Sequence, residues 1–169
     1  MTIHLNGGPV RPGSNITIRA VRPDDKERIV RAFHALDPGS VYLRFFSYRK
    51  ELSEEELRRV TECDGVSEAV LVATDSSADQ EIVVGMGSYA RSGAAAEIAF
   101  AVEEDFQRRG IASRLLQQLA DIARANGVPQ FEADVLAENR SMLSVLRHSG
   151  LPMRESQREG VVHATLFLT

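Results

Sequence analysis

Cysteine is nearly absent from this sequence of 169 residues, which contains only Cys63. One cysteine cannot form a disulfide within the chain, and it leaves no Cys-x-x-Cys pair for a metal ion. The histidines show no ligand spacing with one another or with Cys63; they are His4, His34, His148 and His163. We therefore expect no metal site, and we interpret Cys63, near the end of a predicted helix, as a small buried apolar residue.

Long apolar segments are also missing. Residues 1–15 contain no apolar core of signal-peptide length, and no uninterrupted apolar run elsewhere is long enough to span a membrane. The sequence therefore predicts no membrane partner and a cytoplasmic location. Residues 1–15, which contain Gly-Gly-Pro and Pro-Gly-Ser, are predicted to form a flexible N-terminal arm, and residues 16–169 a single domain.

Positive charge is not concentrated anywhere along the chain. The net charge is -4, and no basic stripe dominates, which argues against nucleic acid as a partner. The contents of 43% apolar and 26% charged residues are ordinary for a soluble globular protein.

Two common phosphate-binding motifs are absent, the dinucleotide fingerprint G-x-G-x-x-G and the Gly-Lys-Ser/Thr of the P-loop. Residues 97–126 nevertheless predict an anion site. An apolar strand (residues 98–102) and an acidic loop (residues 103–105) lead into Gln-Arg-Arg-Gly-Ile-Ala, which opens an amphipathic helix. Its predicted buried stripe comprises Ile111, Ala112, Leu115, Leu116, Leu119, Ala120, Ile122 and Ala123.

The start of this helix is suited to a diphosphate. Backbone N–H groups in the first turn have no partner within the helix, and the helix dipole favours negative charge there. Gly110 allows a ligand to approach the backbone closely, and Ala112 keeps the next side chain short. Arg108 and Arg109 add positive charge, so the segment predicts a binding site for two linked phosphates.

The rest of the chain predicts a mixed α/β domain. Asp24 is expected to cap a first helix whose buried stripe is Ile29, Val30, Phe33 and Leu36, and Ser53 with Glu56 forms a capping box for a second. Further strands are predicted at residues 16–21, 69–74, 82–89, 131–136, 153–157 and 161–168, and a short helix at residues 139–148, closed by Gly150. The predicted order is strand, two helices, three strands, helix, strand, helix, two strands.

Residues 107–112 match the Q/R-x-x-G-x-G/A signature between strand and helix, and in this the chain resembles the GNAT superfamily of N-acetyltransferases. The resemblance implies a central, mostly antiparallel sheet with helices on both faces and acetyl-CoA as co-substrate. The resemblance also implies which residues bind acetyl-CoA. The backbones of Phe100, Ala101 and Val102 would pair with pantetheine, and Gln107, Arg108, Arg109, Gly110, Ile111, Ala112 and Ser113 would hold the pyrophosphate, with Asn139 and Met142 also in contact.

Glu97 is the predicted general base. It precedes an apolar strand, so we expect desolvation to raise the pKa of its carboxyl group towards the range useful for deprotonating an amine. The resemblance implies the same role, often exerted through a water molecule. The alternative is that Glu97 is a polar residue at the entrance of a strand.

A second stretch, residues 139–151, resembles the superfamily's asparagine-and-helix cofactor motif. Asn139 is expected to cap the helix and to reach the cofactor. Many members carry a tyrosine general acid seven residues later, where this chain has Leu146. Tyr42, Tyr89 and bulk water are the alternatives.

The molecule that accepts the acetyl group is implied only by resemblance. Residues 40–46, 96–100, 107–112 and 135–143 resemble the acetyltransferase domain of bacterial protein lysine acetyltransferases that act on acyl-CoA synthetases. A protein lysine is therefore one hypothesis. The others are a small amine, such as a polyamine, amino acid or aminoglycoside, and a non-catalytic acyl-CoA sensor. The aromatic segment 40–47 either packs on the core or forms a wall of the acceptor groove, and a homodimer stays open because no interface is identified.

Overall fold

The computed structural model describes residues 15–39 and 50–169. The predictions for the N-terminal arm, apart from Asn15, and for segment 40–47 concern residues outside these ranges. Within them the predicted order of strands and helices is confirmed, with two short 3-10 helices added at Pro23–Asp25 (η1) and Glu104–Phe106 (η2).

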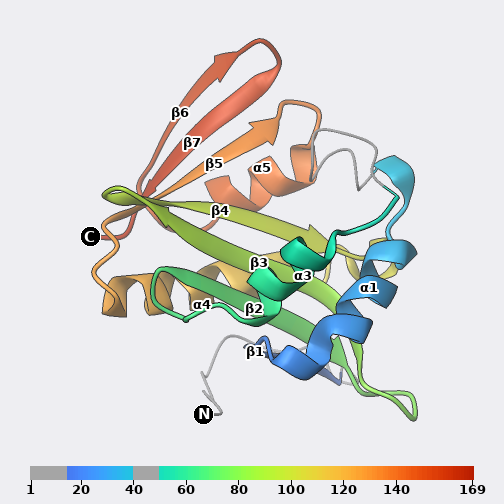
Figure 1. Ribbon diagram of the computed structural model, residues 1–169. Helices are drawn as coiled ribbons and strands as arrows, with labels where there is room; N and C mark the ends of the chain where they lie inside the picture. The colour runs from blue at the N-terminus through green and yellow to red at the C-terminus, as the bar shows by residue number, and fades with distance from the viewer. Residues whose placement is uncertain (1–14, 40–49) are drawn as a thin grey trace.

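Seven strands form one mixed sheet in the order β1-β2-β3-β4-β5-β7-β6 (Figure 1). The strands are β1 (Ile16–Ala20), β2 (Glu68–Asp75), β3 (Ile82–Ser92), β4 (Ala95–Val102), β5 (Gln130–Leu136), β6 (Met153–Arg158) and β7 (Val161–Phe167). All neighbours are antiparallel except β4 and β5. This confirms the predicted mostly antiparallel sheet.

The parallel join is short. Only two residue pairs connect β4 to β5, Ala96 with Phe131 and Glu97 with Glu132. Beyond them the two strands diverge, and the strand edge of β4 is left without a neighbouring strand (Figure 1). The sheet is therefore open along most of the length of β4.

Helices cover both faces, as predicted. The central helix α4 (Ile111–Ala125) and the short α5 (Arg140–Arg147) lie on one face, and α1 (Lys26–Ala35) and α3 (Glu54–Thr61) lie on the other (Figure 1). The main core forms between the sheet and the first pair, where Leu115, Leu119 and Leu146 are almost completely buried. Ile29, Phe33 and Leu57 are buried on the second face.

One close contact in the core requires glycine. A Cβ atom built at Gly87 of β3 would lie 2.8 Å from Cδ1 of Phe100 in β4, because the aromatic ring crosses that position. Gly87 thus lets Phe100 lie flat against β3, under Leu119 of α4. This packing fixes the middle of β4 beside the opening.

Several local predictions need correction. β4 begins at Ala95 and not at Ile98, since the turn before it is tighter than the sequence suggested. α4 begins at Ile111, after the loop that was expected to belong to it. Ile122 is only partly buried, because Ala123 occupies the inward position at that turn of the helix. Cys63 is half-buried, and burial raises the pKa of its thiol.

Capping of the first helix also differs from the prediction. The Ser53 and Glu56 capping box is confirmed at α3, but Asp24 makes no cap and stays exposed. Asp25 is the residue that accepts a bond from the backbone N–H of Arg22, at 2.7 Å. Its side chain is completely buried, so it needs partners of opposite charge.

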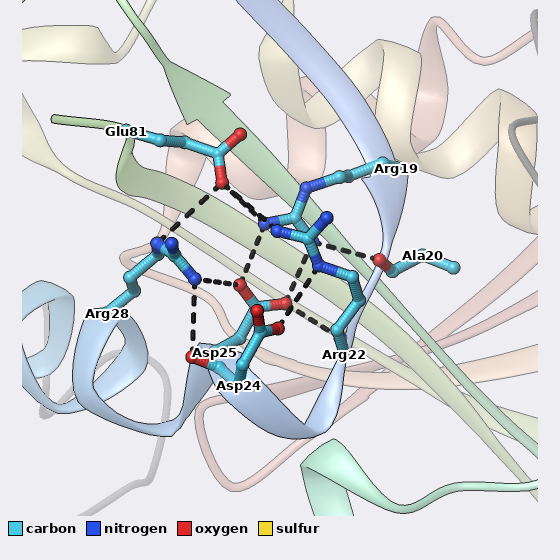
Figure 2. Close-up of polar contacts among 7 residues, drawn as sticks. All are labelled: Arg19, Ala20, Arg22, Asp24, Asp25, Arg28 and Glu81. Carbon is cyan, nitrogen blue, oxygen red and sulfur yellow. Dashed lines mark hydrogen bonds and ion pairs between the residues drawn. The ribbon is translucent and has the colours of Figure 1, made fainter.

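Figure 2 shows these partners. The guanidinium of Arg19 in β1 donates two bonds of 2.8 Å to the Asp25 carboxylate and a third, of 2.7 Å, to Glu81 in the β2–β3 turn. Arg28 of α1 donates to Asp25 at 3.2 Å. The network joins the edge strand, the start of α1 and the turn after β2, and thereby fixes α1 on the sheet.

The charge state of Asp25 follows from two opposing effects. Burial disfavours its carboxylate, and the bonds from Arg19 and the Arg22 backbone outweigh burial, so the pKa of Asp25 lies below its usual value. A carboxyl group whose pKa is lowered on folding stabilises the protein above its unfolded-state pKa, and that stabilisation is lost as pH falls through the folded-state pKa.

We expect Asp25→Asn to lower the free energy of unfolding by about 3 kcal/mol at neutral pH, because it leaves the Arg19 guanidinium without its buried countercharge. Urea denaturation followed by circular dichroism measures this change. The difference between wild type and variant should shrink as pH falls below about 4, the usual value for an aspartate.

Asp24→Asn is the matched control. It removes the same charge one residue away, from an exposed pair with Arg22, and should cost at most about 1 kcal/mol. Equal losses from both substitutions would show that the buried network contributes nothing beyond surface charge.

Candidate active site

A cleft of about 950 Å³ occupies the opening between β4 and β5. Its walls are the exposed edge of β4, the loop before α4 with the start of that helix, the end of β5 and the first turns of α5. The predicted site residues that line it are Glu97, Phe100, Ala101, Val102, Gln107, Arg108, Gly110, Ile111, Ala112, Ser113, Asn139 and Met142. Residues from β4 to the start of α4 and residues from β5 to α5 thus meet at one cavity, although most of α4 separates them in the sequence.

The start of α4 supplies backbone donors at one end of this cleft. The first bond of the helix runs from the N–H of Arg114 to the carbonyl of Gly110, at 3.0 Å. The N–H groups of Ile111, Ala112 and Ser113 therefore have no acceptor within α4. Gly110 has φ of 80° and Arg108 φ of 62°, left-handed values that turn the loop sharply into the helix. Such a turn suits an anion at the helix start.

The edge of β4 offers a second set of backbone groups. The N–H of Glu103 donates to Val84 of β3, and in an antiparallel pair the bonded residues alternate along the strand. The backbone groups of Phe100 and Val102 accordingly face the opening, whereas those of Ala101 face β3. The prediction that Ala101 would pair with a ligand through its backbone is wrong for this reason, although Ala101 is among the residues that line the cleft.

Arg109 does not line the cleft. Its guanidinium lies 4.9 Å from the ring centre of Phe106, which is a cation–π contact. Gln107 lines the cleft but also donates from Nε2 to the carbonyl of Val102, at 3.0 Å. This bond ties the loop to the end of β4 and occupies one of the edge carbonyls.

The opposite wall combines predicted and unexpected residues. Asn139 caps α5 by accepting a 3.3 Å bond from the N–H of Met142, as predicted. The sequence reasoning missed Asp134, whose carboxylate contacts Nδ1 of His163, and Arg140, which adds a cation beside Asn139. The alternation of polar and apolar residues in β5 signals Asp134, and the position of Arg140 at a helix start signals an anion contact.

Glu97 stands where the two strands separate. It belongs to the last residue pair between β4 and β5, and it lines both the cleft and a second cavity on the opposite face of the sheet. Its side chain is exposed, so the predicted desolvation by the apolar strand is wrong. The apolar residues Ile98 and Phe100 point to the other face, towards α4.

The second cavity is a groove of about 380 Å³ between the sheet and the helices α1 and α3. Ile29, Phe33 and Leu57 form its apolar roof, and β3 and β4 form its floor. Glu97 is common to this groove and the cleft, so a molecule in one cavity can meet a molecule in the other beside its carboxylate.

A side chain able to protonate a leaving group is not found at the expected place. Leu146 lines the cleft where the superfamily often has a tyrosine. Tyr89 does not replace it, because its hydroxyl donates to the carbonyl of Val66 at 2.9 Å and accepts from Asn126 at 3.0 Å. Burial raises the pKa of Tyr89. Tyr42 lies outside the described residues.

Two features are absent from residues 15–39 and 50–169. No group of three histidine, cysteine, aspartate or glutamate side chains in these ranges is placed to hold a metal ion. No helix there is long and apolar enough to cross a membrane.

Known proteins resemble this chain in sequence and in fold. The profile of the acetyltransferase (GNAT) family matches residues 40–151. Acetyltransferase Pat of Mycolicibacterium smegmatis is 33% identical over 144 residues, which are 83% of this chain but 42% of that protein. This chain therefore spans less than half the length of that relative.

Solved structures agree with the profile. The GNAT domain of S. lividans PAT is 32% identical, with a TM-score of 0.84 and coverage of 93% of both chains. The structure of yncA from Salmonella typhimurium, solved with acetyl-CoA, has a TM-score of 0.73 at 19% identity and covers 92% of this chain and 95% of its own, a likeness of fold. Together with the family profile, these likenesses show that the chain belongs to the GNAT family of acetyltransferases, enzymes that take their acyl group from acetyl-CoA.

Proposed function

We propose that this protein transfers the acetyl group of acetyl-CoA directly to the side-chain amine of a protein lysine, with Glu97 as general base. The observation that carries the proposal is the position of Glu97 at the meeting point of two cavities. The cleft between β4 and β5 would hold the acyl donor, and the groove under α1 and α3 would admit the amine.

The donor site uses the chain's own backbone. Donors of Ile111, Ala112 and Ser113 would bind the pyrophosphate, aided by the positive charges of Arg108 and Arg140 at the rim. The edge groups of Phe100 and Val102 would pair with the amide groups of pantetheine in the manner of an added strand. This arrangement aims the thioester at the end of β4 that carries Glu97.

The transfer itself requires a neutral amine. The lysine ammonium, with a usual pKa of about 10.4, would lose its proton to the Glu97 carboxylate, directly or through a water molecule. The amine nitrogen then forms a bond to the thioester carbon, and the carbon–sulfur bond breaks to release the thiolate. Since Leu146 has no proton to give, solvent would protonate the thiolate.

The choice of a lysine rests on sequence likeness to protein acetyltransferases over residues 40–46, 96–100, 107–112 and 135–143. The groove that would receive it has the carboxylate of Glu97 in its lining. A cationic side chain therefore fits its charge.

Glu97→Gln should slow acetyl transfer by on the order of 10²–10⁴ at neutral pH, because the amide cannot take the proton. Release of free thiol measures the rate, and calorimetry with coenzyme A should give an unchanged affinity. Glu132→Gln is the matched control, since Glu132 pairs with Glu97 across the strands and is also exposed. Full activity of Glu97→Gln, or an equal loss in both variants, would remove Glu97 from this role.

Gly110→Ala should weaken binding of coenzyme A by about tenfold or more, because a φ of 80° is strained for alanine and the loop must change shape to relieve the strain. Isothermal calorimetry tests this. Gly93→Ala is the control: Gly93 has φ of 64° in the turn before β4, with equally open space around it. Equal affinities in both variants would contradict the assigned donor site.

The acceptor is tested by offering acetyl-CoA with lysine-containing proteins and peptides and with small amines, and by following thiol release and the mass of the acceptor. Acetylation of small amines alone would contradict the lysine proposal. Binding of acetyl-CoA without release for any acceptor would favour an acyl-CoA sensor.

A further inference from the structure

The floor of the groove has a regular pattern. Side chains alternate along a strand, so Glu97, Ala99, Ala101 and Glu103 all point from β4 towards α1 and α3, and all four line the groove. Two methyl side chains thus lie between two carboxylates. At about 3.3 Å per residue, the α carbons of Glu97 and Glu103 are roughly 20 Å apart.

Glu103 is held in place at the far end. Its N–H donates to the carbonyl of Val84 at 2.9 Å, which extends the pairing of β4 with β3 by one residue. Its side chain is partly buried. Burial, followed by the nearby charges of Asp105 and Glu104, raises the pKa of Glu103, which is the behaviour of a carboxylate without a countercharge.

The charged residues that the structure describes around the groove do not supply Glu103 with a countercharge. Arg59 is the only cation among the described residues that line the groove, and its guanidinium donates to Glu68 at 2.9 and 2.7 Å. Glu104 does not line the groove, and it accepts a 3.3 Å bond from the N–H of Asp37, just after α1. Glu103 is therefore the carboxylate that the fold presents to a ligand at this end.

From this spacing we infer that Glu103 is a specificity-determining residue: it binds a second positive charge on the acceptor while the reacting amine lies at Glu97. This inference rests on the proposed function and adds a substrate class, acceptors that carry two cations separated by an apolar segment. The methyl groups of Ala99 and Ala101 would contact that segment.

Two sources could provide such a pair of charges. In an extended peptide, which spans about 3.3–3.6 Å per residue, a lysine or arginine about three to six residues from the acceptor lysine would reach Glu103. A long linear polyamine supplies both charges itself, with one cation at each end of the molecule. The shared chemistry is the second cation, and separate assays distinguish the sources.

The experiment compares acceptors that differ only in this second charge. One series is peptides with a single acceptor lysine and an arginine or a glutamine at each of several distances, and the other is spermine beside a primary alkylamine of similar length. We expect the dicationic member of at least one series to have a kcat/KM about tenfold higher, mainly through a lower KM. Glu103→Gln should remove this preference and leave the monocationic acceptors unchanged.

Asp105→Asn is the matched control, because it removes the same charge from an exposed position that does not line the groove. It should preserve the preference. Equal rates for dicationic and monocationic acceptors in the wild type, or equal losses for both in Glu103→Gln, would overturn the inference. Wild-type protein that releases no thiol with any acceptor would instead contradict the proposed function itself.

Discussion

The short parallel join between β4 and β5 is the constraint on which the other features depend. Backbone N–H and C=O groups inside a fold need partners, and a strand that leaves its neighbour after two residue pairs leaves those groups available. Phe100 and Val102 are held at this open edge by the ring packing over Gly87 and by the Gln107 side chain. The crossover through α4 then brings a helix start to the same opening.

Charges are distributed on opposite sides of β4. The cleft side has helix-start donors with Arg108 and Arg140 at the rim, an environment for phosphates. The groove side has Glu97 and Glu103, an environment for cations. In our proposal one strand thus separates an anion site from a cation site, and Glu97 lines both cavities. Because α1 forms part of the roof of the groove, the buried Arg19–Asp25 pair that anchors α1 also helps to determine the shape of the groove.

Much of this arrangement could be predicted from the sequence where local rules decide the structure. The Ser53 capping box depends on residues three positions apart and was confirmed. The period of α4 was confirmed except at Ala112 and Ile122, which are only partly buried. The Gln107 to Ala112 signature indicated the family that the profile shows. The errors involve distant partners. Asp25 replaces Asp24 as the important aspartate because Arg19 donates to it, and Arg19 is held in turn by Glu81, from a turn 62 residues further along the chain. Likewise, only the strand register shows that Ala101 bonds to β3 and that Glu97 points away from the apolar core.

The alternation of side chains between the two faces of β4 has a practical consequence for engineering. On the cleft side β4 contributes hydrogen-bonding groups of its main chain, which a change of side chain leaves in place, whereas Ala99 and Ala101 contribute methyl groups to the groove. In the proposed arrangement, enlarging or charging these two positions would change the choice of acceptor and would keep the main-chain groups at the edge of β4. If the proposal holds, single substitutions in β4 can therefore alter acceptor preference without removing a main-chain group that pairs with acetyl-CoA.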